Sequence, residues 1–274
     1  MRLILHLGPP KTATSFLQNK VFRFLKGIDF LEKGHLETVG YQKGSIRDLR
    51  RYLSEEKSWR AITLARAANQ YLRHLRQSAH RTVLISNENL TTTEYRLFVS
   101  RGSTPSQVAN RLHLLAKRGG FEQLDVIIAQ RRADHLLASR YAQGAHRQTY
   151  FNQTDFDRRL ARILRRGADW RHYRWLKNDA AVDKLRSALG SNHVHQFDFD
   201  AFQSRPKAEV EKLIAFIDPS QAGLMDRLAS VDPDLFLPIN DRKLTENTWR
   251  LARTEEQIVL SEQTAEALRR TFGF

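Results

Sequence analysis

Short apolar runs and amphipathic stretches alternate along most of the 274 residues. Apolar runs bounded by turn residues are typical of buried strands, and apolar positions three or four apart are typical of helices. The runs predict strands at 2–7, 27–34, 83–86, 124–132 and 193–199. Helices are predicted at about 16–25, 54–78, 106–117, 133–143 and 207–217, with two more within 154–189.

Strands that alternate with helices predict an α/β fold, in which helices flank a central, mainly parallel, doubly wound sheet. We expect one domain over residues 1–274, with a helical excursion around 150–190, because this length buries one sizeable core. The mixed pattern of residues 34–52 indicates a loop or an irregular helix, and the tail beyond a loop at 240–243 predicts two helical stretches. Ligands of such sheets bind beyond the carboxyl ends of the strands, so the segments that follow the strands are candidate sites.

The segment 8–15, GPPKTATS, joins the first strand to the first helix. The start of a helix offers unpaired backbone N–H groups and the positive end of the helix dipole. Here Lys11 and the hydroxyls of Thr12, Thr14 and Ser15 are added to them. This combination predicts an anion site, and a phosphate is the anion that such sites commonly bind.

The spacing of this loop disfavours a nucleoside triphosphate. Gly8 stands three residues before Lys11, whereas a Walker A loop has glycines six residues and one residue before its lysine. The two prolines of the loop lack N–H groups, so we expect a shorter loop that binds a single 5′-phosphate. Later strands end in Ser86-Asn87 and Gln130-Arg131, with no acidic residue to hold magnesium. A kinase is therefore disfavoured.

A second pair of anion-binding residues follows the strand at 124–132. Arg131 closes this strand, and Ser139 lies eight residues further, where the following helix can turn it back toward the guanidinium. A guanidinium fork with a hydroxyl suits a dianionic phosphate, and the start of the helix adds its dipole. Arg132 is the rival for this role, although alternation along a strand should point its side chain to the opposite face.

The loop resembles the 5′-phosphosulfate loop of the sulfotransferase family, a Gly-x-x-Lys-Thr-Gly-Thr type sequence that binds 3′-phosphoadenosine 5′-phosphosulfate (PAPS). Gly8, Lys11, Thr12 and Thr14 match this pattern, and Ala13 stands where the family usually has glycine. The resemblance implies a P-loop-like nucleotide-binding fold, PAPS as co-substrate and no requirement for a metal.

Other segments extend the resemblance along the chain. The spacing of Arg131 and Ser139 is similar to the family's 3′-phosphate site, and residues 169–202 with the helix after them are similar to its bacterial branch. The loop 240–244 falls where the family folds a segment over the 3′-phosphate, which implies a contact from Arg242 or Lys243. The residues implied to bind PAPS are Gly8, Lys11, Thr12, Ala13, Thr14, Ser15, Arg131, Ser139 and Arg242.

Two residues are expected to act on the reacting groups. Lys11 would neutralise the charge that develops on the oxygen between the sulfuryl group and the 5′-phosphate. Glu88 resembles the base of the glycan-sulfating branch and would accept the proton of the acceptor hydroxyl. His6 and His35 stay alternatives for the base.

The net charge of the chain indicates which classes of partner it attracts. A formal charge of +15, from 45 Lys and Arg against 30 Asp and Glu, predicts attraction to polyanions. We expect an acceptor with a hydroxyl or an amine, such as an acidic glycan or an anionic small molecule, and no nucleic acid. Two alternatives stay open: a phosphotransferase that uses ATP, and a basic nucleic-acid-binding protein without catalysis.

The composition also limits the chemistry and the location. The absence of cysteine excludes disulfides and thiolate chemistry. No signal-type apolar segment opens the sequence and no apolar run approaches the length that spans a membrane, so we expect a cytoplasmic protein.

Overall fold

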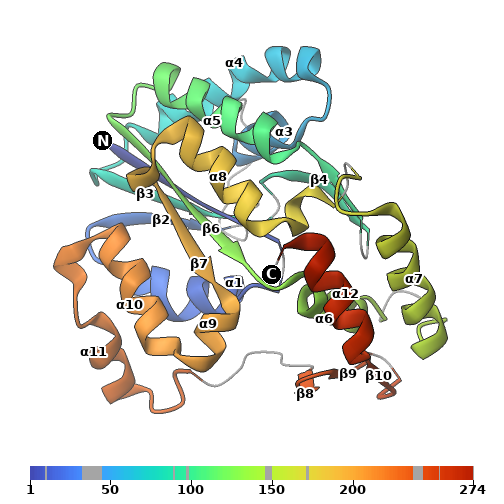
Figure 1. Ribbon diagram of the computed structural model, residues 1–274. Helices are drawn as coiled ribbons and strands as arrows, with labels where there is room; N and C mark the ends of the chain where they lie inside the picture. Colours follow the sequence, from blue (N-terminus) through green and yellow to red (C-terminus); the bar gives the residue numbers. More distant parts are fainter. Residues whose placement is uncertain are drawn as a thin grey trace.

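The computed structural model describes residues 1–9, 11–32, 45–88, 90–96, 99–145, 150–170, 173–236, 243–252 and 254–273. Its centre is a five-stranded parallel sheet, in the spatial order β2-β3-β1-β6-β7 (Figure 1). The strands are β1 (Arg2–Leu7), β2 (Ile28–Glu32), β3 (Thr82–Ser86), β6 (Gln123–Gln130) and β7 (Val194–Asp198). The predicted α/β fold with a parallel central sheet is confirmed.

Alternation along the central strands divides the core into two layers. In β1, Leu3 and Leu5 belong to one apolar cluster and Ile4 belongs to another. All three side chains are fully buried, because helices cover both faces of the sheet. The near-continuous apolar runs of the sequence are the consequence of this double burial.

Helices cover the two faces in separate groups (Figure 1). The first face packs against α3 (Ile46–Ser54), α4 (Ser58–Leu75), α5 (Pro105–Arg118) and α8 (Asn178–Leu189). The second packs against the helical segment after β1 and against α9 (Phe199–Ser204), α10 (Pro206–Ile217) and α11 (Leu224–Val231). The segment after β1 is made of α1 (Thr14–Phe16), a π-helix (Leu17–Val21) and a 3-10 turn (Phe22–Phe24).

A third apolar cluster lies beyond the carboxyl ends of the strands. It joins α6 (Ala133–Gly144) and α7 (Gln153–Arg166) to the last helix, α12 (Glu262–Phe272). A small antiparallel sheet completes it, with β8 (Lys243–Thr245), β9 (Thr248–Arg250) and β10 (Gln257–Val259). The end of the chain therefore returns to the edge of the sheet where ligands are expected to bind.

Some sequence predictions were wrong in detail. The tail beyond residue 243 contains three strands and one helix instead of two helical stretches. The buried residues Trp249, Leu251, Ile258 and Leu260 alternate with more exposed neighbours, which is the period of a strand. A helical spacing was assigned to this stretch because each of its strands is only three residues long.

Two other boundaries also differ. Residues 46–52, which the sequence pattern assigns to a loop or an irregular helix, belong to the regular helix α3, which begins with a capping box between Ser45 and Asp48. The helix predicted at 54–78 begins only at Ser58. Between β3 and α5, the antiparallel pair β4 (Thr92–Arg96) and β5 (Val99–Gly102) was not predicted. Among the described helices, none is long and apolar enough to cross a membrane.

Candidate active site

The strand order places three of the predicted segments at one edge of the sheet. β1 lies in the middle, its own connection leads to β2 on one side, and β6 lies on its other side and leads to β7. This reversal next to β1 is a topological switch point, and the ligands of open α/β sheets generally bind beyond the carboxyl ends of the strands at such a point. The loop at 8–15 follows β1, Arg131 follows β6, and Glu88 follows β3.

The loop after β1 has two residues in the left-handed region just before the helix begins. Lys11 has a φ of 73°, and Ala13 is left-handed at φ 59° and ψ 16°. Thr14 then begins α1 in the right-handed region. Left-handed and right-handed residues in succession form a nest, in which consecutive N–H groups converge on an anion. The predicted phosphate loop therefore has a backbone suited to that role.

The hydroxyl side chains of the loop differ in their surroundings. The Thr12 side chain is fully buried, and its hydroxyl donates a hydrogen bond to the carbonyl oxygen of Pro9 at 2.8 Å. This bond closes the turn, so Thr12 can offer an anion its backbone N–H rather than its hydroxyl proton. Thr14 is buried and Ser15 is exposed.

Gly8 brings the loop into contact with β6. Its φ is 139°, a region that residues with a side chain rarely adopt. A Cβ atom added to Gly8 would stand 2.6 Å from the carbonyl oxygen of Ala129 in β6. Glycine is thus required for two reasons, the backbone conformation at this position and the close approach of the loop to β6.

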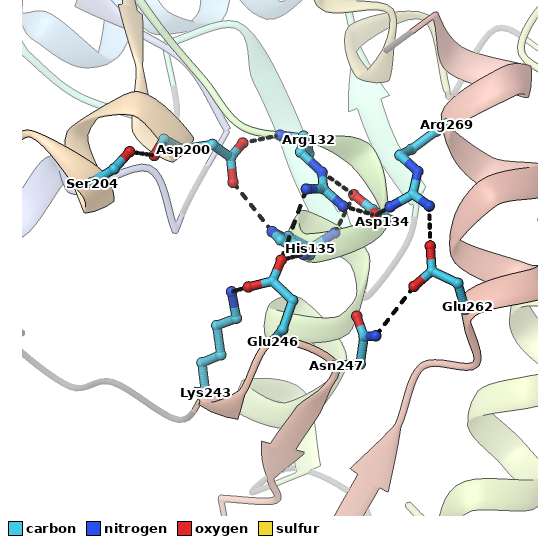
Figure 2. A network of polar contacts seen from close by, with 10 residues as sticks. All are labelled: Arg132, Asp134, His135, Asp200, Ser204, Lys243, Glu246, Asn247, Glu262 and Arg269. Carbon is cyan, nitrogen blue, oxygen red and sulfur yellow. Dashed lines mark hydrogen bonds and ion pairs between the residues drawn. The ribbon is translucent and has the colours of Figure 1, made fainter.

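Arg131 joins the two predicted phosphate-binding elements. Its Nη1 donates to the carbonyl oxygen of Lys11 at 3.0 Å, across 120 residues of sequence. Its side chain is buried, and its guanidinium carbon lies 4.4 Å from the ring centre of Phe199. Arg132 turns away, donating from Nη2 and Nε to the Asp134 carboxylate at 2.7 and 3.2 Å (Figure 2). Of the two arginines, Arg131 is the one that contacts the loop. Both lie beyond the end of β6 at Gln130, so the strand is shorter than the predicted 124–132 and alternation along it does not decide their directions.

Glu88 leaves the sheet next to the loop. His6 of β1 pairs with Ser86 of β3 in the parallel register, so Gly8 and Glu88 each lie two residues beyond this pair, past the ends of two neighbouring strands. Adjacent strands are about 4.8 Å apart. Glu88 is half-buried. Its role as a base stays a prediction, as does the pairing of Ser139 in α6 with Arg131.

Buried polar residues join β1 and β3 to the helical segment that follows the loop. The Nδ1 atom of His6 lies 2.7 Å from the Ser86 hydroxyl, and the Gln18 amide donates to the hydroxyl and the carbonyl oxygen of Ser86 at 3.0 and 3.1 Å. Burial disfavours the imidazolium and lowers the pKa of His6 to about 3. His6 is therefore neutral at physiological pH and joins β1 to β3. The alternative base His35 lies outside the described residues.

Gln18 was not predicted as part of this site. It belongs to the π-helical turn Leu17–Val21, and such turns are rare and frequent at functional sites. The widened turn is not visible in the sequence, because its apolar residues keep helical spacing.

A second group of polar residues surrounds the start of α6 (Figure 2). Asp200 of α9 accepts the backbone N–H of Arg132 at 2.7 Å and lies 3.2 Å from Nδ1 of His135. Burial raises the pKa of the Asp200 carboxyl, but the hydrogen bonds from His135 and Arg132 and the charge of Arg131 together hold it below its usual value. Asp200 is therefore ionised, and its negative charge attracts the guanidinium of Arg131.

The C-terminal segment reaches the same place. Glu246, between β8 and β9, lies 3.0 Å from Nε2 of His135, and Nζ of Lys243 bonds its carboxylate at 2.9 Å. Lys243 thus lies near the start of α6 (Figure 2). Arg242, which was predicted to contact the 3′-phosphate, lies outside the described residues. Phe199, Asp200 and Glu246 were not predicted, because only the folded chain brings them to this edge.

Replacing Ala13 with glycine should raise the free energy of unfolding by about 0.5–1 kcal/mol. The left-handed conformation is unfavourable for alanine and costs glycine nothing, and the greater freedom of glycine in the unfolded chain offsets part of this gain. The matched control is Ala161→Gly, at an exposed position within α7, which should lower the free energy of unfolding by about 1 kcal/mol. Urea unfolding of both variants checks the prediction, and a loss of stability in Ala13→Gly would contradict it.

Two solved structures that are similar to this chain are sulfotransferases. The sulfotransferase from Alicyclobacillus acidocaldarius aligns with a TM-score of 0.47 and 16% identity, over 78% of this chain and 79% of that chain. The sulfotransferase domain from the Synechococcus PCC 7002 olefin synthase aligns with a TM-score of 0.39 and 14% identity, over 100% of this chain and 95% of that chain. No protein-family model matches the sequence, and neither does any curated protein.

Proposed function

We propose that this protein is a sulfotransferase that moves a sulfuryl group from PAPS to a hydroxyl or amine of its acceptor. One observation carries the proposal. The Arg131 side chain bonds the backbone of Lys11, so an arginine suited to one phosphate lies against a loop suited to another. PAPS carries a phosphate on each side of its ribose, and two neighbouring anion sites match that arrangement.

The loop and the end of β6 would each hold one phosphate. The nest at Ala13 and Thr14, with the Lys11 ammonium, suits the 5′-phosphate side. A guanidinium has five N–H donors, so the bond from Arg131 to the Lys11 carbonyl oxygen is compatible with a second, bidentate interaction with the 3′-phosphate. Ser139 and Arg242 would add to this second site.

The reaction would need little beyond position and charge. The acceptor oxygen or nitrogen would form a bond to sulfur while the bond from sulfur to the bridging oxygen breaks. Lys11 would stabilise the negative charge on that oxygen, which stays on adenosine 3′,5′-bisphosphate as it leaves. Glu88 would accept the proton that the acceptor loses. His6 is less suited to this role, because its lowered pKa makes it a weak base.

The charge of the protein supports an anionic acceptor. A net charge of +15 attracts acidic glycans and anionic small molecules and raises their local concentration. A transfer assay with PAPS over glycans, phenols, alcohols and lipids would identify the acceptor class.

Adenosine 3′,5′-bisphosphate should bind about 10- to 100-fold more tightly than adenosine 5′-phosphate. The reason is the contact of Arg131 with the 3′-phosphate, since a hydrogen bond to a charged group contributes about 1.5–3 kcal/mol. Isothermal titration calorimetry measures both affinities, with ATP and magnesium as the comparison. Tight binding of ATP with magnesium, without any gain from a 3′-phosphate, would contradict the proposal and favour a phosphotransferase.

A further inference from the structure

The start of α9 lies against the turn that carries Arg131. The Phe199 ring covers the Arg131 guanidinium at 4.4 Å from the ring centre. The next residue, Asp200, accepts the backbone N–H of Arg132 at 2.7 Å and lies 3.2 Å from Nδ1 of His135. Two consecutive residues of one helix therefore contact the side chain of Arg131 and the backbone that follows it.

We propose that Phe199 and Asp200 are positioning residues that hold the Arg131 guanidinium in the orientation that recognises the 3′-phosphate of the donor. This inference rests on the proposed function. It assigns the preference for a 3′-phosphorylated nucleotide to residues of α9 that need not touch the nucleotide.

Each residue constrains a different part of the arginine. An aromatic face attracts a cation and favours a stacked guanidinium plane, so Phe199 limits the directions in which the N–H donors point. Asp200 holds the turn between β6 and α6 through the backbone N–H of Arg132 and the imidazole of His135. Because Arg131 immediately precedes Arg132, the position of its Cα depends on this contact.

The same helix also reaches the loop after β1. The centre of the Phe202 ring lies 5.0 Å from the ring centre of Phe16, which belongs to α1, and 5.5 Å from the ring centre of Phe197 in β7. The side chain of Asp198 caps α9 by accepting the backbone N–H groups of Asp200 and Ala201 at 2.8 and 3.1 Å. Anchored in this way, α9 contacts both anion-binding elements and can keep their separation constant.

The test is the preference for the 3′-phosphate in two variants. Phe199→Leu keeps apolar packing and removes the aromatic face, and Asp200→Asn keeps an oxygen for the Arg132 N–H and removes the charge. Titration calorimetry measures the dissociation constants of adenosine 3′,5′-bisphosphate and adenosine 5′-phosphate. The preference for the 3′-phosphate is the dissociation constant of adenosine 5′-phosphate divided by that of adenosine 3′,5′-bisphosphate. We expect this ratio to fall about fivefold or more in each variant, because the 3′-phosphate contact weakens and the 5′-phosphate contact does not. Phe199→Tyr, which keeps the aromatic face, should retain the ratio of the wild type.

Matched controls separate positioning from a loss of stability. Phe121→Leu is the same change in the apolar core, just before the amino end of β6, where it contacts neither α9 nor the loop after β1. Asp226→Asn removes the same charge from an exposed pair with Lys207. Both controls should keep the ratio, although Phe121→Leu should lower the thermal unfolding temperature.

The outcomes separate the two proposals. If the wild type prefers the 3′-phosphate and both variants keep this preference, the role of α9 is wrong while the proposed function stands. If the controls lower the ratio as much as the variants, the effect is one of stability, and the role of α9 is again wrong. If the wild type shows no preference for the 3′-phosphate, the proposed function fails and the inference fails with it.

Discussion

Lys11→Ala should lower the rate of sulfuryl transfer by about a thousandfold or more, with a change of less than about 1 kcal/mol in the free energy of unfolding. Its ammonium group is the cation that we assign to the bridging oxygen, where negative charge develops as the bond to sulfur breaks. The substitution keeps the backbone carbonyl of residue 11, which is the atom that Arg131 contacts. The link between the two elements that we propose to bind the phosphates should therefore survive while the rate falls.

The measurement pairs a PAPS transfer assay with thermal unfolding of the same samples. Lys20→Ala is the matched control, because Lys20 lies on the helical segment that follows the loop and pairs with Asp232 at 2.6 Å. Its turnover should equal that of the wild type. Full activity in Lys11→Ala would remove this residue from the site and with it the proposed mechanism.

Gly8→Ala should lower the free energy of unfolding by about 3 kcal/mol and weaken the binding of adenosine 3′,5′-bisphosphate. The added Cβ atom would stand 2.6 Å from the carbonyl oxygen of Ala129, so the loop or β6 must move. Such a movement separates the nest from Arg131, which follows β6. Stability and binding should therefore fall together.

Gly27→Ala provides the comparison for this change. Gly27 also has a positive φ, 68°, but a Cβ atom added there has no atom within 4 Å. Its substitution should cost only about 1 kcal/mol, the penalty of a left-handed conformation, and should leave binding unchanged. Chemical denaturation and calorimetry of the two variants decide the point. Equal losses of stability in both would show that the approach to β6 is not the cause.

The elements that the sequence predicted best are those with long, regular patterns. The apolar runs of β1, β3 and β6 and the helices α5, α6 and α10 are found within a few residues of their expected bounds. The small sheet β8–β10 was missed, because strands of three residues leave almost no periodicity to recognise. Local pattern is informative only where an element is long enough to repeat it.

The candidate site also has a part that the sequence predicted and a part that only the structure shows. The loop after β1 was recognisable because its glycine, lysine and hydroxyl residues are consecutive, and Arg131 was preferred to Arg132 because side chains alternate along a strand. Ala13 differs from the glycine of the sulfotransferase loop pattern, and only the structure shows why glycine is suited to this position. Its left-handed backbone explains why glycine would suit the position.

By itself, the sequence determined the alternation of strands and helices, the position of the loop predicted to bind an anion at the end of the first strand, and the absence of thiolate chemistry. Each of these depends on residues that are close together in the chain or on composition. Only the tertiary structure decided the strand order β2-β3-β1-β6-β7, which places Arg131 against Lys11 and Phe199 against Arg131. The pairing of strands more than a hundred residues apart depends on how whole faces pack together, and local periodicity carries no record of that.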